Sequence, residues 1–370
     1  MEDIEGCRTA LMGGHTNQCD SCGFTDISYN SCRNRHCPKC QALNKARWLE
    51  ARERELLPVK YFHLVFTVPH ELNPLFVTNK RILLGGLFKT VNNTLREFCR
   101  NPRYRLDGQL GYTAVLHTWD QKLGPHYHLH LIVPAGVWCK QTAQWQPARY
   151  RFLFPVKAMS IVFRAKLVSH IRRMYRKNAL VFPGKAACYA RPEPFSDLLS
   201  LVMAKPWVVY AKRPFKSPKF VLDYLGRYTH RVAISNNRIT SIDNGKVCFT
   251  YKQRQRGGSM EFRTCQLDVD QFIRRFLIHE LPVGFMRIRH FGFLGNACKT
   301  KNLEIIRRLL NVQPNPEKTN KKSTAQLMLD LTGIDITRCP KCKQGSLKKV
   351  DEFDGIYKKY RRYESLRKAG

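Results

Sequence analysis

The chain has 370 residues, and its 64 lysines and arginines outnumber its 28 aspartates and glutamates, which gives a formal net charge of +36. This excess predicts an anionic partner, either nucleic acid or an anionic membrane surface. With 43% hydrophobic and 11% aromatic residues, the chain is too apolar to be a disordered basic tail. The length allows about two or three folded domains.

Targeting signals and cysteines indicate the cellular compartment of the protein. No run approaches the ~18 apolar residues that a membrane-spanning helix needs. The N-terminal sequence MEDIEGCRTA lacks the basic head and apolar run of a signal peptide. We therefore expect a cytoplasmic protein without a membrane partner. Half of the 14 cysteines are clustered, which in a chain of this length indicates metal binding in a reducing compartment rather than a disulfide scaffold.

The first cysteine cluster has the spacing of a zinc site. Cys19 and Cys22 are followed after 14 residues by Cys37 and Cys40, in the pattern C-x2-C-x14-C-x2-C. Two such pairs can offer four thiolates to one tetrahedral Zn²⁺, and a closed site of this kind has a structural role. The sequence predicts the zinc ion more firmly than the identity of its four ligands, because three further candidate ligands lie close by: His15, Cys32 and His36.

Basic residues lie between and after these cysteines. Arg33, Arg35 and Lys39 are the closest of them, and we predict that they contact DNA phosphates. The alternative is a solvated basic surface, and the charge of the whole chain favours the phosphate contacts.

The middle of the chain alternates strand and helix patterns. A buried strand is predicted over 61–68 and a helix over 74–100, followed by strands over 111–119 and 126–133 that are joined by a turn. An amphipathic segment at 156–175 and a strand-like run at 207–210 come next. This β-α-β-β order predicts an α+β domain with an antiparallel sheet and helices packed on one face.

Three histidines alternate with apolar residues in the second of these strands, at His126, His128 and His130. Alternate side chains of a strand share a face, so all three are predicted to point the same way. Neighbouring positions on a face are ~6.6 Å apart, close enough for two rings to reach one ion, whereas the outer two are ~13 Å apart. The metal pair is therefore His126 with His128, or His128 with His130. The alternative is a polar sheet face whose histidines are satisfied by hydrogen bonds.

A tyrosine pair follows on a predicted helix that starts at Ser217 and Pro218, a capping residue and a residue suited to the first helical position. Tyr224 and Tyr228 are one turn apart and share a side of this helix. From spacing alone, the interpretation of both tyrosines as core residues is slightly favoured. Two arginines flank the pair and could hold a phosphate or lower the pKa of a tyrosine: Arg227 and Arg231.

The combination of these features points to chemistry on DNA. A tyrosine oxygen can attack a phosphodiester and form a phosphotyrosine, provided that a metal polarises the scissile phosphate. Paired histidines, paired tyrosines and a strongly basic chain are the groups that this reaction requires.

Three segments of the sequence resemble a known family. They are residues 29–41 (YNSCRNRHCPKCQ), the His128-Leu-His130 element with the run into Pro134, and residues 224–236 (YLGRYTHRVAISN). Their order and length resemble the rolling-circle transposases of insertion sequence ninety-one type, which are two-tyrosine members of the HUH endonuclease superfamily. The resemblance spans roughly residues 10 to 300.

The resemblance implies an α+β fold, with an HUH-type antiparallel sheet and packed helices preceded by a small zinc-binding domain. It places the metal pair at His128 and His130, which would hold Mg²⁺ or Mn²⁺ in the catalytic site. The third ligand stays open among His126, His117 and Asp223. We predict a zinc-binding, DNA-contacting domain over 1–57, an HUH nuclease domain with the two-tyrosine helix over 58–300, and a C-terminal helical and basic region over 301–370.

The implied activity is rolling-circle transposition of an insertion sequence. One tyrosine, Tyr224 or Tyr228, would cleave a single DNA strand and leave a 5′-phosphotyrosine and a free 3′-hydroxyl, and the other could take a second strand. The expected partner is DNA, especially the single-stranded or hairpin ends of a mobile element, and the expected location is the bacterial cytoplasm in association with the nucleoid.

The C-terminal third is less informative. A hairpin is predicted around the turn 243–245, a second turn at 257–258, helices over 269–278 and 303–310, and a linker over 313–323. Cys339 and Cys342 form a lone CxxC, which is either half of a second zinc site, completed by a distant cysteine such as Cys298 or by a histidine, or a pair of reduced thiols. The tail beyond residue 357 is basic.

A second function class explains the same charge. In it, the chain is a zinc-dependent nucleic-acid-binding protein without catalysis, and its histidines and tyrosines stack on bases or fill a core. Covalent attachment of the protein to cleaved DNA discriminates the two classes.

Overall fold

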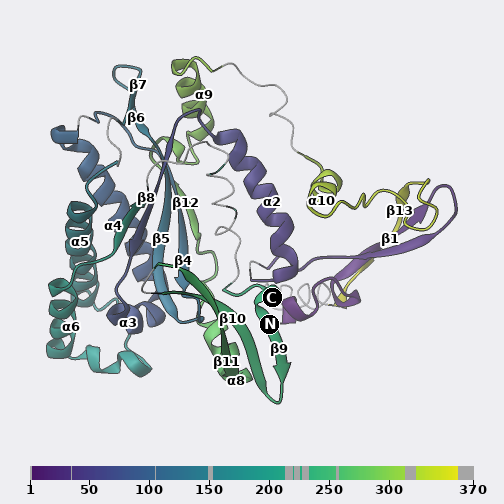
Figure 1. The fold of residues 1–370 in the computed structure, drawn as a ribbon, viewed down its shortest axis with the longest axis horizontal. Coiled ribbons are helices and arrows are strands. Elements are labelled where there is room, and N and C mark those ends of the chain that lie inside the picture. The colour runs from purple at the N-terminus through teal and green to yellow at the C-terminus, as the bar shows by residue number, and fades with distance from the viewer. Residues whose placement is uncertain are drawn as a thin grey trace, which may run out of the picture. The chain divides into compact units, whose positions relative to one another are not determined.

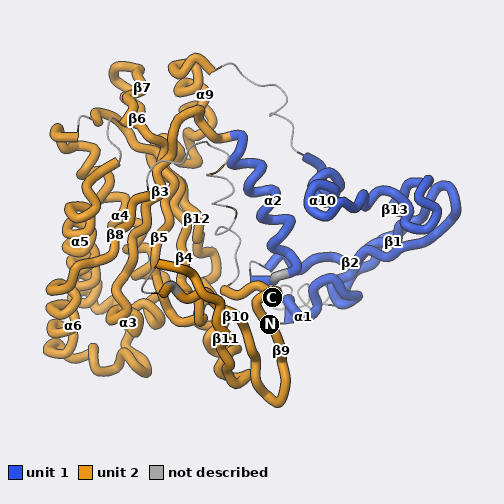
Figure 2. The backbone as a smooth tube through the Cα atoms, viewed as in Figure 1, with its two compact units in different colours: residues 1–54, 230–232, 315–370 blue, residues 55–229, 233–314 orange. Residues whose placement is uncertain are grey.

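The computed structural model describes residues 2–34, 36–104, 106–148, 153–212, 220, 226, 233–255, 258–312 and 322–356. The chain divides into two units, one of residues 1–54, 230–232 and 315–370 and one of residues 55–229 and 233–314 (Figure 2). This division falls at residues 54/55 and 314/315, whereas the domains over 1–57, 58–300 and 301–370 stay a prediction.

A five-stranded sheet forms the centre of the larger unit, in the order β12-β4-β5-β3-β8. Each neighbouring pair of strands is antiparallel. The bounds of the strands, in sheet order, are Ile288–Phe291, Tyr112–Trp119, Pro125–Pro134, Tyr61–Thr67 and Val209–Lys212. The predicted α+β class with an antiparallel sheet is confirmed. The edge strand β12 was not predicted, because its sequence carries no clear strand pattern.

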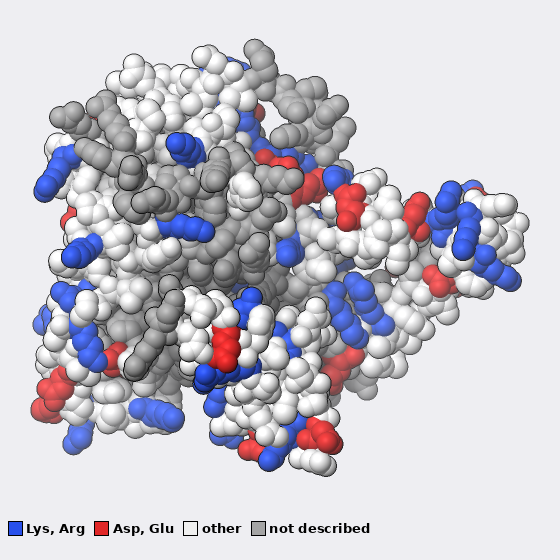
Figure 3. Space-filling view, in the orientation of Figure 1, with Lys and Arg blue, Asp and Glu red and all other residues white. Residues whose placement is uncertain are grey.

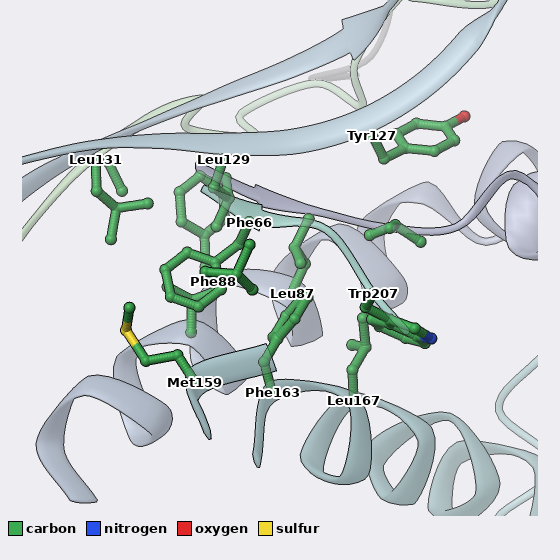
Figure 4. Packing of buried hydrophobic residues seen from close by; sticks show 14 of the residues in the cluster. Phe66, Leu87, Phe88, Tyr127, Leu129, Leu131, Met159, Phe163, Leu167 and Trp207 are labelled. Atoms are coloured by element: carbon green, nitrogen blue, oxygen red, sulfur yellow. The ribbon is translucent and has the colours of Figure 1, made fainter. Parts of the chain in front are cut away.

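Helices cover one face of this sheet (Figure 1). They are α3 (Asn73–Thr78), α4 (Lys80–Arg100), α5 (Val156–Arg176) and α6 (Pro192–Ala204). Figure 4 shows Leu129 and Leu131 of β5 with Phe66 of β3 directed toward these helices. Phe163 of α5 packs edge-on against Phe66, with ring centroids 5.1 Å apart, and against Trp207 at 5.3 Å. Apolar burial between this face and the helices holds the larger unit together.

The helix predicted over 74–100 is divided at Asn79. The residue has φ −115° and ψ 39°, outside the helical region. Its buried side-chain amide donates to the Val181 carbonyl at 2.9 Å, and its amide oxygen accepts from the Val181 backbone N–H at 2.8 Å. These bonds pair the backbone N–H and carbonyl of Val181 in a distant loop, and the periodicity of the sequence could not reveal them.

Smaller elements complete the larger unit. Asn244 and Gly245 both have positive φ, 49° and 71°, as a two-residue hairpin turn requires, so the hairpin predicted around 243–245 is confirmed. Residues 256–257, part of the second predicted turn, lie outside the described residues. The elements are β6 (Gly136–Cys139), β7 (Gln144–Pro147), β9 (Ile239–Asp243), β10 (Lys246–Arg254), β11 (Met260–Asp268), α8 (Val269–Leu277) and α9 (Lys299–Leu309).

The smaller unit joins both ends of the chain. Its three-stranded sheet has the order β13-β1-β2, so the C-terminal strand pairs with the N-terminal one. The bounds are Glu2–Glu5 for α1, Gly13–Cys19 for β1, Thr25–Tyr29 for β2, Pro38–Glu55 for α2, Thr324–Thr332 for α10 and Leu347–Asp354 for β13. No helix in the described part of the chain is both long and apolar enough to cross a bilayer.

Replacement of Phe163 tests the packing of the larger unit. Phe163→Ala removes a fully buried ring between Phe66 and Trp207. We expect it to lower the free energy of unfolding by about 3–5 kcal/mol, measured by urea denaturation. Ile161→Ala, at an exposed position of the same helix, is the matched control and should change it by less than about 1 kcal/mol. Equal losses in the two variants would contradict this packing.

Candidate active site and metal centres

The face of the sheet opposite the helices carries the histidines. Tyr127 and Leu129 of β5 are in the hydrophobic core, so the alternate residues His126, His128 and His130 are on the other face, as the alternation predicts. His117 of β4 is paired directly with His128 and therefore shares its face.

Three of these histidines converge. His117, His128 and His130 each offer a ring nitrogen, and these three nitrogens lie within 4.8 Å of one another. The ring centroids of His117 are 5.2 Å from those of His128 and 4.5 Å from those of His130, and the latter two are 4.9 Å apart. Two nitrogens bound to one ion are ~3–4 Å apart, so small ring rotations would bring all three onto one metal.

Hydrogen bonds select the nitrogen that each ring presents. His128 Nδ1–H donates to the carbonyl oxygen of His126 at 3.1 Å, so Nε2 is the nitrogen that could bind a metal. His130 Nδ1 lies 2.9 Å from His63 Nε2, and the two rings are stacked with centroids 5.2 Å apart. A partner at Nδ1 again directs Nε2 to the metal, which is the arrangement found around metal-bound histidines in general.

Burial keeps these imidazoles neutral. Removal from water lowers the pKa of His130 to about 3 and that of His63 to about 4, and holds that of His128 well below its usual range. Neighbouring histidines add to this effect, because two imidazolium charges repel each other. All three groups are therefore uncharged at neutral pH, and a neutral imidazole is the form that binds a metal.

The structure brings some of the predicted metal ligands together. It groups His128 and His130 with His117, one of the three candidates for the third ligand, whereas His126 shares the face but is outside the group. Asp223 lies outside the described residues, as do Tyr224, Tyr228, Arg227 and Arg231. Sequence analysis did not identify His63, because a single histidine in a predicted buried strand carries no motif.

The cysteines of the smaller unit form two groups. The first contains Cys7, Cys32, Cys37 and Cys40, and the second contains Cys19, Cys22, Cys339 and Cys342. Sulfur-sulfur distances are 3.5 Å for Cys7–Cys40 and 3.7 Å for Cys32–Cys40 in the first group. In the second they are 3.7 Å for Cys19–Cys342 and 3.8 Å for Cys22–Cys339.

This grouping differs from the predicted zinc site. The structure places Cys19 and Cys22 in one cysteine group and Cys37 and Cys40 in the other. Spacing correctly marked both CxxC pairs, but it could not say which pairs meet. Cys7, a single cysteine in the sequence, is a member of the first group, and Cys298 is not the partner of the C-terminal CxxC.

Comparison with known proteins identifies the family. A family model described as "Putative transposase" matches residues 111–302, more than half of the chain. A second model, described as "Transposase zinc-binding domain" and specific to the IS91 type, matches residues 1–68. The chain belongs to the transposases of the IS91 type.

Two relatives agree with this assignment. The transposase is 42% identical over 358 residues to "Putative transposase y4qJ" of Sinorhizobium fredii, which covers 96% of this chain and 89% of that protein. It is 26% identical over 346 residues to "Transposase for insertion sequence element IS801" of Pseudomonas savastanoi pv. phaseolicola, which covers 91% of this chain and 79% of that protein. No solved structure matches the chain at a significant level.

Membership of the family establishes the general function of the protein. The transposase is an enzyme that acts on DNA, and its zinc-binding domain and cysteine groups together support structural zinc. Backbone amides of Gly345 and Gln344 lower the pKa of Cys342 to about 6, which favours its thiolate form.

Positive charge is spread over one face of the transposase. On the face in Figure 3, lysine and arginine side chains lie at separate places rather than in one patch. Of the predicted phosphate contacts, Arg33 and Lys39 are exposed, and Arg35 lies outside the described residues. The Lys39 ammonium also donates to the Cys7 carbonyl at 3.1 Å, so this lysine supports the first cysteine group as well.

Replacement of Cys7 tests the ligands of the first group. Cys7→Ser should lower the zinc content of the purified transposase by about one ion per chain, measured by plasma mass spectrometry, because three thiolates bind zinc more weakly than four. Cys188→Ser, at an exposed cysteine outside both groups, is the control and should leave the content unchanged. Loss of zinc from His15→Ala or His36→Ala, with no loss from Cys7→Ser, would show that a histidine is the fourth ligand.

Proposed function

We propose that the transposase is a metal-dependent single-strand DNA endonuclease and strand transferase that moves its insertion sequence by a rolling-circle route. The observation that carries this proposal is the convergence of His117, His128 and His130 within 4.8 Å on one face of the central sheet. A structural role does not explain why three imidazoles, of which His128 and His130 are held neutral, gather at one point of a transposase.

The three histidines would hold one divalent cation. Of the two expected ions, an all-imidazole set suits Mn²⁺ better than Mg²⁺, which prefers oxygen ligands. Three protein ligands leave further coordination positions open for a phosphate oxygen. When bound, the metal would supply Lewis-acid polarisation of the scissile phosphate.

The tyrosines supply the nucleophile in this proposal, and their assignment rests on the sequence. The oxygen of Tyr224 or Tyr228 attacks phosphorus and loses its proton. The bond from phosphorus to the 3′-oxygen breaks, and that oxygen leaves as a 3′-hydroxyl after taking up a proton. The 5′-phosphotyrosine conserves the energy of the broken bond, so a 3′-hydroxyl of another strand can reverse the reaction and complete the transfer without a nucleotide cofactor.

His63 would position the metal ligand His130. The two rings are stacked, and their nitrogens are 2.9 Å apart. His63 does not belong to the converging group itself. A bond to Nδ1 of a ligating histidine fixes the orientation of the ring, so His63 supports the site without contact to the metal.

Covalent capture tests the reaction. Incubation of the transposase with single-stranded DNA that carries an end of its element, plus Mn²⁺ or Mg²⁺, should give a protein-DNA adduct that a protease destroys. We expect no adduct from the double variant Tyr224→Phe/Tyr228→Phe, because the attacking oxygens are gone. Hairpin and fully paired DNA with the same end sequence test whether single strands are preferred. A wild-type protein that binds these DNAs tightly and gives no adduct would favour the non-catalytic binding module.

A pair of histidine variants tests the metal site. His117→Ala should weaken Mn²⁺ binding at least about tenfold, measured by titration calorimetry, and should abolish the adduct with little loss of DNA affinity. His126→Ala is the matched control, because His126 lies on the same face of the sheet but outside the converging group, and the bond to His128 uses its backbone oxygen. A larger loss of Mn²⁺ affinity in His126→Ala than in His117→Ala would show that His126, and not His117, is the third ligand.

A further inference from the structure

We propose that Cys19, Cys22, Cys339 and Cys342 bind a second structural zinc ion, which fastens the C-terminal segment of the transposase to its N-terminal zinc-binding domain. The family model for that domain ends at residue 68. Two of the four ligands therefore lie more than 270 residues beyond it in the sequence, so the folded domain is discontinuous.

The sulfur distances match a zinc tetrahedron. Four sulfurs at ~2.3 Å from one ion are separated by ~3.8 Å. The observed separations are 3.7 Å for Cys19–Cys342 and 3.8 Å for Cys22–Cys339. A disulfide would bring two sulfurs to ~2.05 Å, so neither contact is a covalent bond.

The two CxxC turns have the same backbone structure. Cys19 N–H donates to the Phe24 carbonyl at 2.8 Å, and Cys339 N–H donates to the Gly345 carbonyl at 2.9 Å. The residue after each pair has positive φ, 71° at Gly23 and 58° at Lys343. In each turn, this residue donates its N–H to the carbonyl of the first cysteine, at 3.1 Å and 3.0 Å. Two equivalent turns that face each other are the arrangement of a four-cysteine zinc ribbon.

Further contacts are built around the four sulfurs. The backbone N–H of Ser21 donates to Cys19 Sγ at 3.4 Å, and that of Gly345 donates to Cys342 Sγ at 3.3 Å. Such bonds stabilise thiolate charge. A Cβ at Gly345 would lie 2.4 Å from Cys19 Sγ, so only glycine allows the two turns to approach this closely.

The C-terminal segment buries little apolar surface of its own. Within the described residues 322–356, the buried apolar side chains are those of Leu327 and Cys339. So small a core offsets only a small part of the entropy lost when about 35 residues are ordered. Pairing of β13 with β1 adds backbone hydrogen bonds, each of which contributes only about 0.5–1.5 kcal/mol of net stability. A metal ion supplies the missing stabilisation, as it does in other small domains.

The link between the C-terminal segment and the zinc-binding domain also fixes where the basic C-terminal sequence begins. Because Gly13 is paired with Asp354, the end of β13 is fixed beside the start of β1. The sequence that follows β13 contains Lys358, Lys359, Arg361 and Arg362. The second zinc ion thus anchors the origin of this basic sequence on the zinc-binding domain.

Zinc stoichiometry tests the proposal on the full-length chain. Native mass spectrometry should find two zinc ions in the wild type and one in Cys339→Ser/Cys342→Ser. The control Cys188→Ser/Cys298→Ser changes two exposed cysteines outside both groups and should keep two ions. One ion in the wild type, or two in Cys339→Ser/Cys342→Ser, would overturn the proposal.

Alkylation of the wild type tests it without any variant. Cys22 is exposed, so burial cannot protect it, and Cys342 is half-buried. With zinc bound, N-ethylmaleimide should modify Cys188 and Cys298 at once but leave Cys22 and Cys342 unmodified, and a chelator should make both of them reactive. Modification of Cys22 and Cys342 at the rate of Cys188 in the zinc-loaded protein would refute the second site. Neither measurement depends on DNA cleavage, so its result is independent of the nuclease proposal.

Discussion

The alternation of side chains along β5 is the constraint on which the larger unit depends. Tyr127, Leu129 and Leu131 point into the core against the helices, and His128 and His130 point to the opposite face. A strand has a period of two, so a slip of one residue would exchange these faces and place imidazoles in the core. The register that buries the leucines is therefore the register that assembles the histidines, and pairing with β4 brings His117 opposite His128. Core and candidate active site are two results of one pairing.

The histidine face of the sheet lowers the stability of the fold. His63, His117 and His130 are buried polar rings, and buried polar groups destabilise a protein unless they are hydrogen-bonded. Contact between His63 and His130, and donation from His128 to a backbone carbonyl, offset part of this cost. The same burial keeps His63 and His130 neutral, and the hydrogen bonds leave Nε2 of His128 and His130 as the nitrogens that could bind a metal. Features that weaken the sheet as a structure thus prepare it as a metal site.

Sequence reasoning predicted what local patterns determine and failed where long-range pairing decides. Alternation in 126–130 placed three histidines on one face, and CxxC spacing marked Cys37–Cys40 and Cys339–Cys342 as half-sites. A CxxC pair supplies two ligands of a tetrahedron and carries no information on the other two. Pairing of β13 with β1 brings Cys339 to Cys19, and nothing within either segment announces that pairing. Cys7 and His63 are single residues without a motif, so only the fold reveals them.

The two units are stabilised by different physical means. A large apolar cluster between sheet and helices holds the larger unit, so its stability follows buried area. The described part of the smaller unit buries few large side chains, and its cysteine groups take the place of a core. Zinc binding requires deprotonated thiols and is withdrawn by chelators, whereas apolar burial responds to neither. Loss of metal should therefore unfold the part of the transposase that carries both chain ends, and leave intact the sheet that carries the histidines.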